Sequence, residues 1–248
     1  MELAHSNHPS NQHSRRRRGY RYYDLILGAF VTVLLCSNLI GAGKAATIDL
    51  PILGNVVFGA GVLFFPISYL FGDILTEVYG YAYDRRAVWC GFAALTFAAL
   101  MSQVVIHLTP ATGNYNQHLQ ESLESVFGNT WRIILGSMIA FWAGSLVNSY
   151  VLAKMKIYSN GKHLWMRMIG STAVGELVDS ALFYVLAFYA IWPIEQVIQV
   201  ALTQYVLKTA WEVIATPMTY KIVAFLKNKE DEDFYDVDTN FTPFRLKP

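Results

Sequence analysis

Charged residues are scarce in this chain. Asp, Glu, Lys and Arg make up 15% of its 248 residues, against about 25% in a typical soluble domain. Hydrophobic residues make up 54%, and the mean hydropathy is +0.32. This composition excludes an ordinary water-soluble protein, and several apolar runs reach the roughly 20 residues that cross a bilayer. We therefore expect an integral membrane protein surrounded by lipid.

Cysteine is nearly absent, and the common catalytic motifs are missing. Cys36 and Cys90 lie in apolar runs without a CxxC spacing, which argues against a disulfide framework and favours buried structural thiols. There is no metal-ligand spacing, phosphate-binding loop or nucleophile elbow. The Gly-rich stretch at 41–47 lacks the GxxxxGK(S/T) spacing of a nucleotide site. We expect no metal and no cofactor.

Six apolar runs are long enough to span a bilayer as helices. They cover residues 23–43, 57–79, 87–108, 133–153, 165–190 and 197–220. We predict an all-α integral membrane protein with six transmembrane helices over 20–228. A disordered basic tail at 1–19 precedes this domain, and an acidic, poorly ordered tail at 229–248 follows it.

The segments between the spans carry their own signals. Pro66 predicts a kink in the second span. Residues 44–55 predict a short external hairpin or a re-entrant piece, and 109–130 an amphipathic helix lying on the surface. Lys and Arg cluster in the tail and turns that six spans would place on one side. Since positive loops stay in the cytoplasm, we predict that both termini are cytoplasmic. Next to a membrane segment, the basic tail favours anionic lipid over nucleic acid.

Two carboxylates lie inside the second span, where each costs at least about 2.5 kcal/mol at the bilayer centre. Asp73 and Glu77 are four residues apart and share one helix face, with Tyr69 one turn earlier. Alternatives for Glu77 are a place at the membrane interface or a pair with Arg85 or Arg86.

Further polar side chains follow in the later spans. Asn148 lies in the fourth span, Glu176 and Asp179 in the fifth, and Lys208 and Glu212 in the sixth. We expect Lys208 to pair with Asp179 or Glu176. Such a pair still leaves an excess of negative charge, so at least one acid must be protonated, hold a cation or face water.

The two acidic spans contain a short internal similarity. GDIL at 72–75 and GELV at 175–178 each lie in the middle helix of a three-span half. Halves with three spans run in opposite directions, which is the layout of a 3+3 inverted repeat with a binding site at mid-membrane.

Longer stretches resemble one known family. FPISYLFGDILTEVYGYAYDRR, STAVGELVDSALFY and QYVLKTAWEVIATP are similar to motifs of the vitamin uptake transporter family, also called the queuosine precursor transporter family, and the terminal DTNFTPF resembles the tail of many bacterial members. The resemblance covers about residues 20–245. It implies six membrane helices in a bacterial inner membrane and the import of 7-deazaguanine precursors of queuosine.

The resemblance also implies site residues. Its motif positions fall on Asp73, Thr76, Glu77, Gly175, Glu176, Asp179, Tyr205 and Lys208. Some members have Asn at the position of Glu176, which makes its role less secure than that of Asp179. Combining the motif with the polar residues of the spans gives these candidate substrate-binding residues: Asp73, Glu77, Glu176, Asp179, Tyr205, Lys208, Tyr69 and Asn148.

These residues suit a deazapurine base bound at mid-membrane between the second, fifth and sixth spans. A carboxylate can accept hydrogen bonds from the ring N–H and the exocyclic amine of a guanine-like edge together. Lys208 can donate to the carbonyl oxygen. The alternative function is an intramembrane enzyme that uses the buried acids with Lys208 and His107. The sequence leaves open the precursor, the coupling ion, a homo-oligomeric state and the acid that pairs with Lys208.

Overall fold

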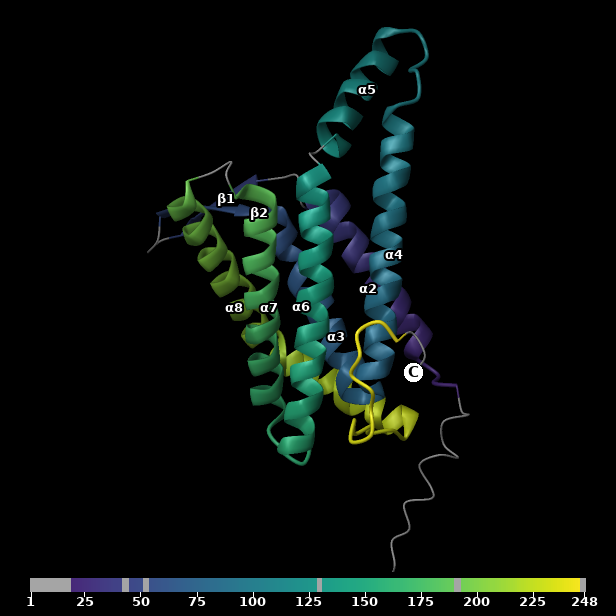
Figure 1. The fold of residues 1–248 in the computed structure, drawn as a ribbon, viewed down its shortest axis with the longest axis vertical. Helices are drawn as coiled ribbons and strands as arrows, with labels where there is room; N and C mark the ends of the chain where they lie inside the picture. The colour runs from purple at the N-terminus through teal and green to yellow at the C-terminus, as the bar shows by residue number, and fades with distance from the viewer. Residues whose placement is uncertain (1–18, 42–44, 51–53, 129–130, 190–192, 246–248) are drawn as a thin grey trace, which may run out of the picture.

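The computed structural model describes residues 19–41, 45–50, 54–128, 131–189 and 193–245. Helices dominate it (Figure 1). In chain order the elements are α2 (Tyr23–Cys36), the π-helical turn Ser37–Gly41, β1 (Ala45–Leu50), β2 (Gly54–Gly59), the 3-10 turn Ala60–Leu63, α3 (Phe65–Tyr79), α4 (Tyr81–Ile106), α5 (Asn114–Phe127), α6 (Trp131–Tyr158), α7 (Leu164–Phe188) and α8 (Ile194–Glu230). The predicted basic tail at 1–19 lies outside the described residues except for Gly19.

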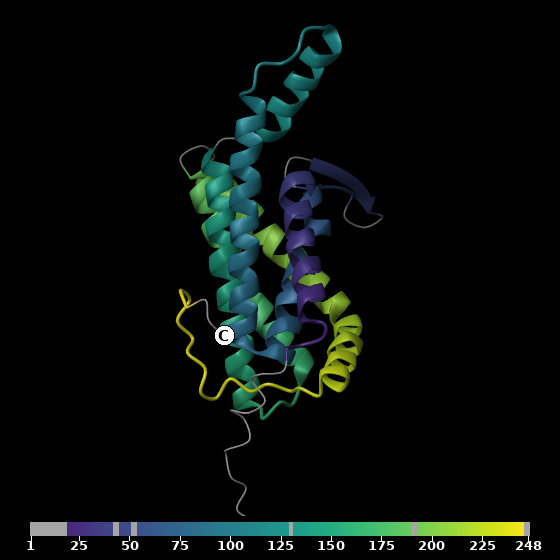
Figure 2. The same ribbon diagram turned by 90° about the vertical axis from the view of Figure 1, so that its right-hand side faces the viewer.

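The helices form one elongated bundle whose two ends differ (Figures 1 and 2). The β-hairpin lies at one end, and α5 projects beyond it from the tip of α4. The C-terminal segment crosses the opposite end. The backbone N–H of Tyr22 donates to Glu230 there at 2.7 Å, so the start of α2 meets the end of α8. We call this end of the bundle the termini end.

Four helices among the described residues are long and apolar enough to cross a membrane. They are Tyr23–Ile40, Tyr81–Ile106, Leu135–Tyr158 and Leu164–Phe188. The other two predicted spans depart from that pattern, since α3 has 15 residues and α8 has 37 with several charges. The structure supports a helical membrane protein, while six spans and a 3+3 inverted repeat stay predictions.

The second predicted span begins later than expected. Residues 45–50 and 54–59 pair as antiparallel strands, with Ala45 opposite Gly59 and Leu50 opposite Gly54. The expected hairpin is therefore present, and longer than predicted. Pro66 lies in the first turn of α3 and does not kink it. Proline suits that position because its missing N–H would have no partner in the helix anyway.

Two glycines allow α6 and α7 to approach closely. A Cβ atom on Gly175 would lie 2.7 Å from Asn148 Cβ and 2.9 Å from the Gly144 carbonyl oxygen. A Cβ atom on Gly144 would lie 2.9 Å from the Gly175 carbonyl oxygen. The backbones of the two helices are thus in contact, as at the small-residue interfaces of membrane helices.

The C-terminal segment after α8 was expected to be poorly ordered, but residues 231–245 are bonded to the bundle. Both carboxylate oxygens of Asp236 accept the Tyr81 N–H at 3.1 Å, at the start of α4. Arg85 donates to two tail carbonyls, at 2.6 Å and 2.9 Å, and Trp89 to a third at 2.8 Å. Composition alone missed these contacts because their donors belong to α4, about 155 residues earlier.

We expect Gly175→Ala to destabilise the protein by about 1–3 kcal/mol, because the added methyl group overpacks the contact between α6 and α7. Gly28→Ala is the matched control, since a Cβ on Gly28 meets no atom within 4 Å. Thermal unfolding of both variants in detergent measures the difference. An equal Tm for the two would contradict the close packing of these helices.

Asp236→Ala should lower stability by about 1–3 kcal/mol, because the buried Tyr81 N–H loses its acceptor. Asp238→Ala removes an exposed tail acid of the same type and should leave the Tm unchanged. Thermal unfolding of the full chain is again the measurement. A Tm loss of the same size in both variants would show that the effect is one of tail charge and not of this hydrogen bond.

Candidate functional site

Lys208 on α8 bridges two carboxylates of α7. Its Nζ lies 2.8 Å from Glu176 Oε2 and 2.5 Å from Asp179 Oδ2. The lysine side chain is 11% exposed, Glu176 1% and Asp179 10%. The two acids are three residues apart, so one face of α7 presents both. The sequence predicted a pair with one of them, and the structure pairs Lys208 with both.

Aromatic side chains of α3 extend this site. The Phe65 ring centre lies 5.4 Å from Lys208 Nζ, within the range of a cation–π contact. One turn later, Tyr69 brings its hydroxyl to Gly144 of α6, where Asp179 Cβ also lies. Tyr69 is 3% exposed. α3, α6 and α7 therefore meet around Asp179.

Asn148 connects Asp73 to the same region. Its Nδ2 donates to Asp73 Oδ1 at 2.7 Å, and both side chains are 1% exposed. The Asn148 side chain packs beside Gly175, the residue before Glu176. We use the term polar cluster for Tyr69, Asp73, Asn148, Glu176, Asp179, Lys208 and Glu212.

Many buried polar atoms in and beside the polar cluster have no hydrogen-bond partner within the described part of the chain. They are Asp73 Oδ2, Asn148 Oδ1, Glu176 Oε1, both carboxylate oxygens of Glu212, and the hydroxyls of Tyr69, Thr76, Thr172, Ser180 and Thr209. Buried polar atoms in proteins are nearly always satisfied. Such a concentration of unsatisfied acceptors and hydroxyls is typical of a place that binds something polar.

The polar cluster also carries more negative than positive charge. Asp73, Glu176, Asp179 and Glu212 are acids, and Lys208 is its only cation. In the described ranges no Lys or Arg forms an ion pair with Asp73 or Glu212. The sequence predicted an excess of negative charge from Asp73, Glu176 and Asp179, and Glu212 adds a fourth acid. The excess suits a ligand with hydrogen-bond donors or a positive charge.

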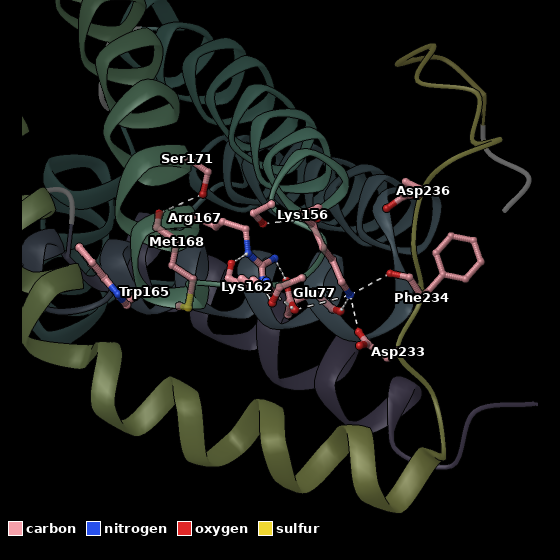
Figure 3. Close-up of polar contacts among 12 residues, drawn as sticks. Glu77, Lys156, Lys162, Trp165, Arg167, Met168, Ser171, Asp233, Phe234 and Asp236 are labelled. Carbon is pink, nitrogen blue, oxygen red and sulfur yellow. Dashed lines mark hydrogen bonds and ion pairs between the residues drawn. The ribbon is translucent and has the colours of Figure 1, made fainter.

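Glu77 lies outside the polar cluster, one turn nearer the termini end of α3. Figure 3 shows its contacts. Arg167 of α7 donates to both of its oxygens, with Nη2 3.1 Å from Oε1. Lys227 Nζ lies 2.6 Å from Oε1, and Lys156 Nζ 3.5 Å from it. Glu77 is 1% exposed and has three cations around it. These contacts make it a link between helices in this structure.

The alternative pair of Glu77 with Arg85 or Arg86 is not formed, because Glu77 is paired with Arg167, Lys156 and Lys227. Arg85 is directed to the tail carbonyls instead. No local signal pointed to Arg167, because it follows Glu77 by 90 residues and lies on a different helix, α7. Asp84 was missed for a similar reason. It lies in the first turn of α4 beside Arg85 and Arg86, yet it is fully buried and accepts a hydrogen bond from Ser149 of α6.

A tail acid completes the group around Glu77 (Figure 3). Asp233 Oδ1 lies 2.6 Å from Lys156 Nζ and 2.8 Å from Lys227 Nζ. Burial raises the pKa of the Asp233 carboxyl, but the hydrogen bonds from the two lysines outweigh this effect and hold the pKa below its ordinary value. Asp233 therefore stays ionised at neutral pH and ties the tail to α6 and α8.

Tyr205 is the candidate with the weakest link to the polar cluster. It lies on α8 close to Lys208, is partly buried, and makes no side-chain hydrogen bond with the described residues. As for metals, the described residues contain no group of three or more His, Cys, Asp or Glu that could hold an ion.

Comparison with known proteins agrees with the resemblance of the motifs. The family model described as "Putative vitamin uptake transporter" matches residues 59–222, which include α3, α4, α6 and α7 entire. A protein of Bacillus subtilis (strain 168) named "Probable queuosine precursor transporter" is 32% identical over 212 residues, covering 82% of this chain and 87% of the relative. No solved structure matches. The chain belongs to the vitamin uptake transporter family.

Proposed function

We propose that this protein imports a 7-deazaguanine precursor of queuosine across a bacterial inner membrane. The observation that carries the proposal is the polar cluster, in which buried acceptors outnumber their donors among membrane-type helices. The name of the Bacillus subtilis relative supports the same substrate class. In this proposal the protein lies in the lipid bilayer, and we assign it no oligomeric state.

The polar cluster fits the hydrogen-bonding groups of such a base. A guanine-like edge presents adjacent N–H donors, and Asp73 Oδ2 and Glu176 Oε1 are acceptors without partners in the described chain. Tyr69 and Phe65 supply flat surfaces beside Asp179 and Lys208, respectively. Lys208 holds Glu176 and Asp179 in place and leaves Glu176 Oε1 without a partner in the described chain.

The proposed topology has six spans with α3 and α8 as the second and sixth, and both termini in the cytoplasm. The start of α2 and the end of α8 meet at one end of the bundle, which an even number of spans requires. Lys156, Arg167 and Lys227 gather at that same end. The clustering of these cations supports a cytoplasmic assignment for the termini end.

The enzyme alternative finds no support in the geometry. A lysine acts as a general base only when it is deprotonated. Lys208 donates hydrogen bonds to two carboxylates, which favours its charged form and not a free amine. His107, the other expected base, lies at the far end of α4 with its ring Nδ1 at a backbone carbonyl, 2.8 Å away.

Uptake of a labelled 7-deazaguanine base into cells that lack other importers tests the function directly. Cells with the wild-type protein should accumulate it, and Asp73→Asn should reduce uptake at least about tenfold, because one lost charged hydrogen bond costs about 1.5–3 kcal/mol. Membrane levels of both proteins are measured in parallel. Normal uptake by Asp73→Asn at equal level would remove Asp73 from the site.

Lys208 and Asp179 should be energetically coupled. Lys208→Met alone leaves two buried carboxylates without their cation, and Asp179→Asn alone removes one of two charged partners. We expect the double variant to lose less stability than the sum of the two singles, by about 0.5–3 kcal/mol. Thermal unfolding in detergent of the wild type, the two single variants and the double variant measures this coupling. Additive losses would mean that the two side chains are not in contact.

A further inference from the structure

Four helices build both the polar cluster and a second charged group nearer the termini end. The polar cluster takes its side chains from α3, α6, α7 and α8. Each of these helices also supplies one charged side chain to the second group, which we call the Glu77 group: Glu77, Lys156, Arg167 and Lys227. The helices around the proposed substrate site are thus joined to one another by charge.

The Glu77 group lies on the termini side of the polar cluster along each of these helices. Glu77 follows Asp73 by 4 residues on α3, and Arg167 precedes Glu176 by 9 residues on α7, which starts at the termini end. At 1.5 Å per residue these steps are about 6 Å and 14 Å along the helix axes. The lysines of α6 and α8 likewise come after the polar-cluster residues of their helices. A ligand that moves from the polar cluster toward the termini end therefore meets the Glu77 group.

The Glu77 group is closed to solvent in this structure. The side chains of Glu77, Lys156 and Arg167 are each 1% exposed, and that of Lys227 is 25% exposed. Besides its ion pair with the carboxylate, Lys156 donates to the backbone carbonyl of Glu77 at 2.6 Å. Lys156 therefore holds both the side chain and the main chain of α3. Water from the termini end does not reach Glu77 in this arrangement.

The tail acid Asp233 lies on the outer side of this group (Figure 3). It is 45% exposed, and it contacts the two lysines at the distances given above. The next tail residue adds a backbone contact, because Lys156 donates to the Phe234 carbonyl at 2.8 Å. Asp233 thus holds α6 and α8 to each other across the end of α3, at a place that solvent can reach.

We propose that the Glu77 group is the cytoplasmic gate of the transport route, and that Asp233 is the latch that holds it closed. The inference rests on the proposed transport function and topology. A base released from the polar cluster toward the termini end passes between these four helices, and parting them separates the Glu77 group. Breaking the ion pairs makes opening costly, while the water that reaches the charges as they part limits that cost.

A fixed structural link is the alternative, and the composition of the Glu77 group argues against it. Apolar side chains of similar size often hold buried helices together as well as an ion pair does, or better. Charged side chains differ in having two favourable settings, since they are paired when the helices are together and hydrated when the helices part. A joint that opens to water uses both settings, whereas a permanent joint uses only the first.

The reactivity of a cysteine placed behind the gate measures whether it opens. Thr172 lies on α7 between the Glu77 group and the polar cluster and is 2% exposed. Thr172→Cys is made in a chain without the native thiols, Cys36→Ser and Cys90→Ser, and treated with a membrane-impermeant maleimide on inside-out vesicles. Labelling should be slow. Asp233→Asn should speed it by about threefold or more, because two partly exposed ion pairs are lost.

A matched variant and a matched probe control this experiment. Asp238→Asn changes an exposed acid of the same tail and should leave the labelling rate unchanged. Ala187 is 0% exposed near the far end of α7, so Ala187→Cys should stay unlabelled from the cytoplasmic side in every variant. Faster labelling of both probes in Asp233→Asn would show a general loosening and overturn the gate. An equal rate at Thr172→Cys with Asp233 and with Asp233→Asn would overturn the latch.

Glu77→Gln tests the gate itself. It removes the charge that the three cations share, and it should speed labelling of Thr172→Cys more than Asp233→Asn does. Elution as one folded species in detergent is checked for each variant. If Glu77→Gln does not fold, Asp233→Asn decides alone, because its side chain is the more exposed of the two. Unchanged labelling in the folded variants would overturn the proposal.

Transport is measured separately, so that the two proposals fail in different ways. Proteoliposomes with the wild-type protein should exchange internal for external labelled 7-deazaguanine. Absence of exchange would overturn the transport function for this base, whatever the labelling shows. Exchange together with fast labelling of Thr172→Cys in the otherwise unchanged protein would overturn the gate and leave the transport function standing.

Discussion

A carboxylate cannot stay ionised inside a protein in lipid unless something compensates its charge, and this constraint organises the structure. Along α3 the protein meets it in two ways, one turn apart. Glu77 is held by three cations from three other helices. Asp73 receives a single neutral amide and no cation among the described residues. The same helix therefore contains one saturated acid and one acid that still needs a partner.

The saturated acid joins elements far apart in the chain. Arg167 of α7, Lys156 of α6 and Lys227 of α8 all reach Glu77, and Asp233 of the tail contacts the two lysines. Sliding α3 relative to these helices at the termini end would expose several buried charges at once, which is costly. The polar cluster lies away from this group and has unsatisfied atoms that a ligand can complete. The group around Glu77 thus holds the helices together at the termini end, while the polar cluster farther along the bundle is the proposed substrate site.

The sequence predicted the parts of this arrangement that depend on local pattern. Apolar runs located α2, α4, α6 and α7, and the spacings of Glu176, Asp179 and Lys208 indicated residues that do meet. The extent of the hairpin was less visible in the sequence. The second span was therefore predicted to start at residue 57, which lies two residues before β2 ends. Partners distant in sequence were not predictable at all. Nothing near Glu77 shows that a cation 90 residues later packs against it, because that contact depends on how α3 and α7 cross.

The tail has a consequence for how the chain is made. Arg85 and Trp89 of α4 take their acceptors from residues 240–243, and the Tyr81 N–H takes its acceptor from Asp236. A ribosome completes α4 and about 130 more residues before these acceptors exist. Until then the start of α4 has no tail to bond to, and water or lipid headgroups must serve in its place. Closure of the termini end therefore comes only after every helix of the bundle has been synthesised.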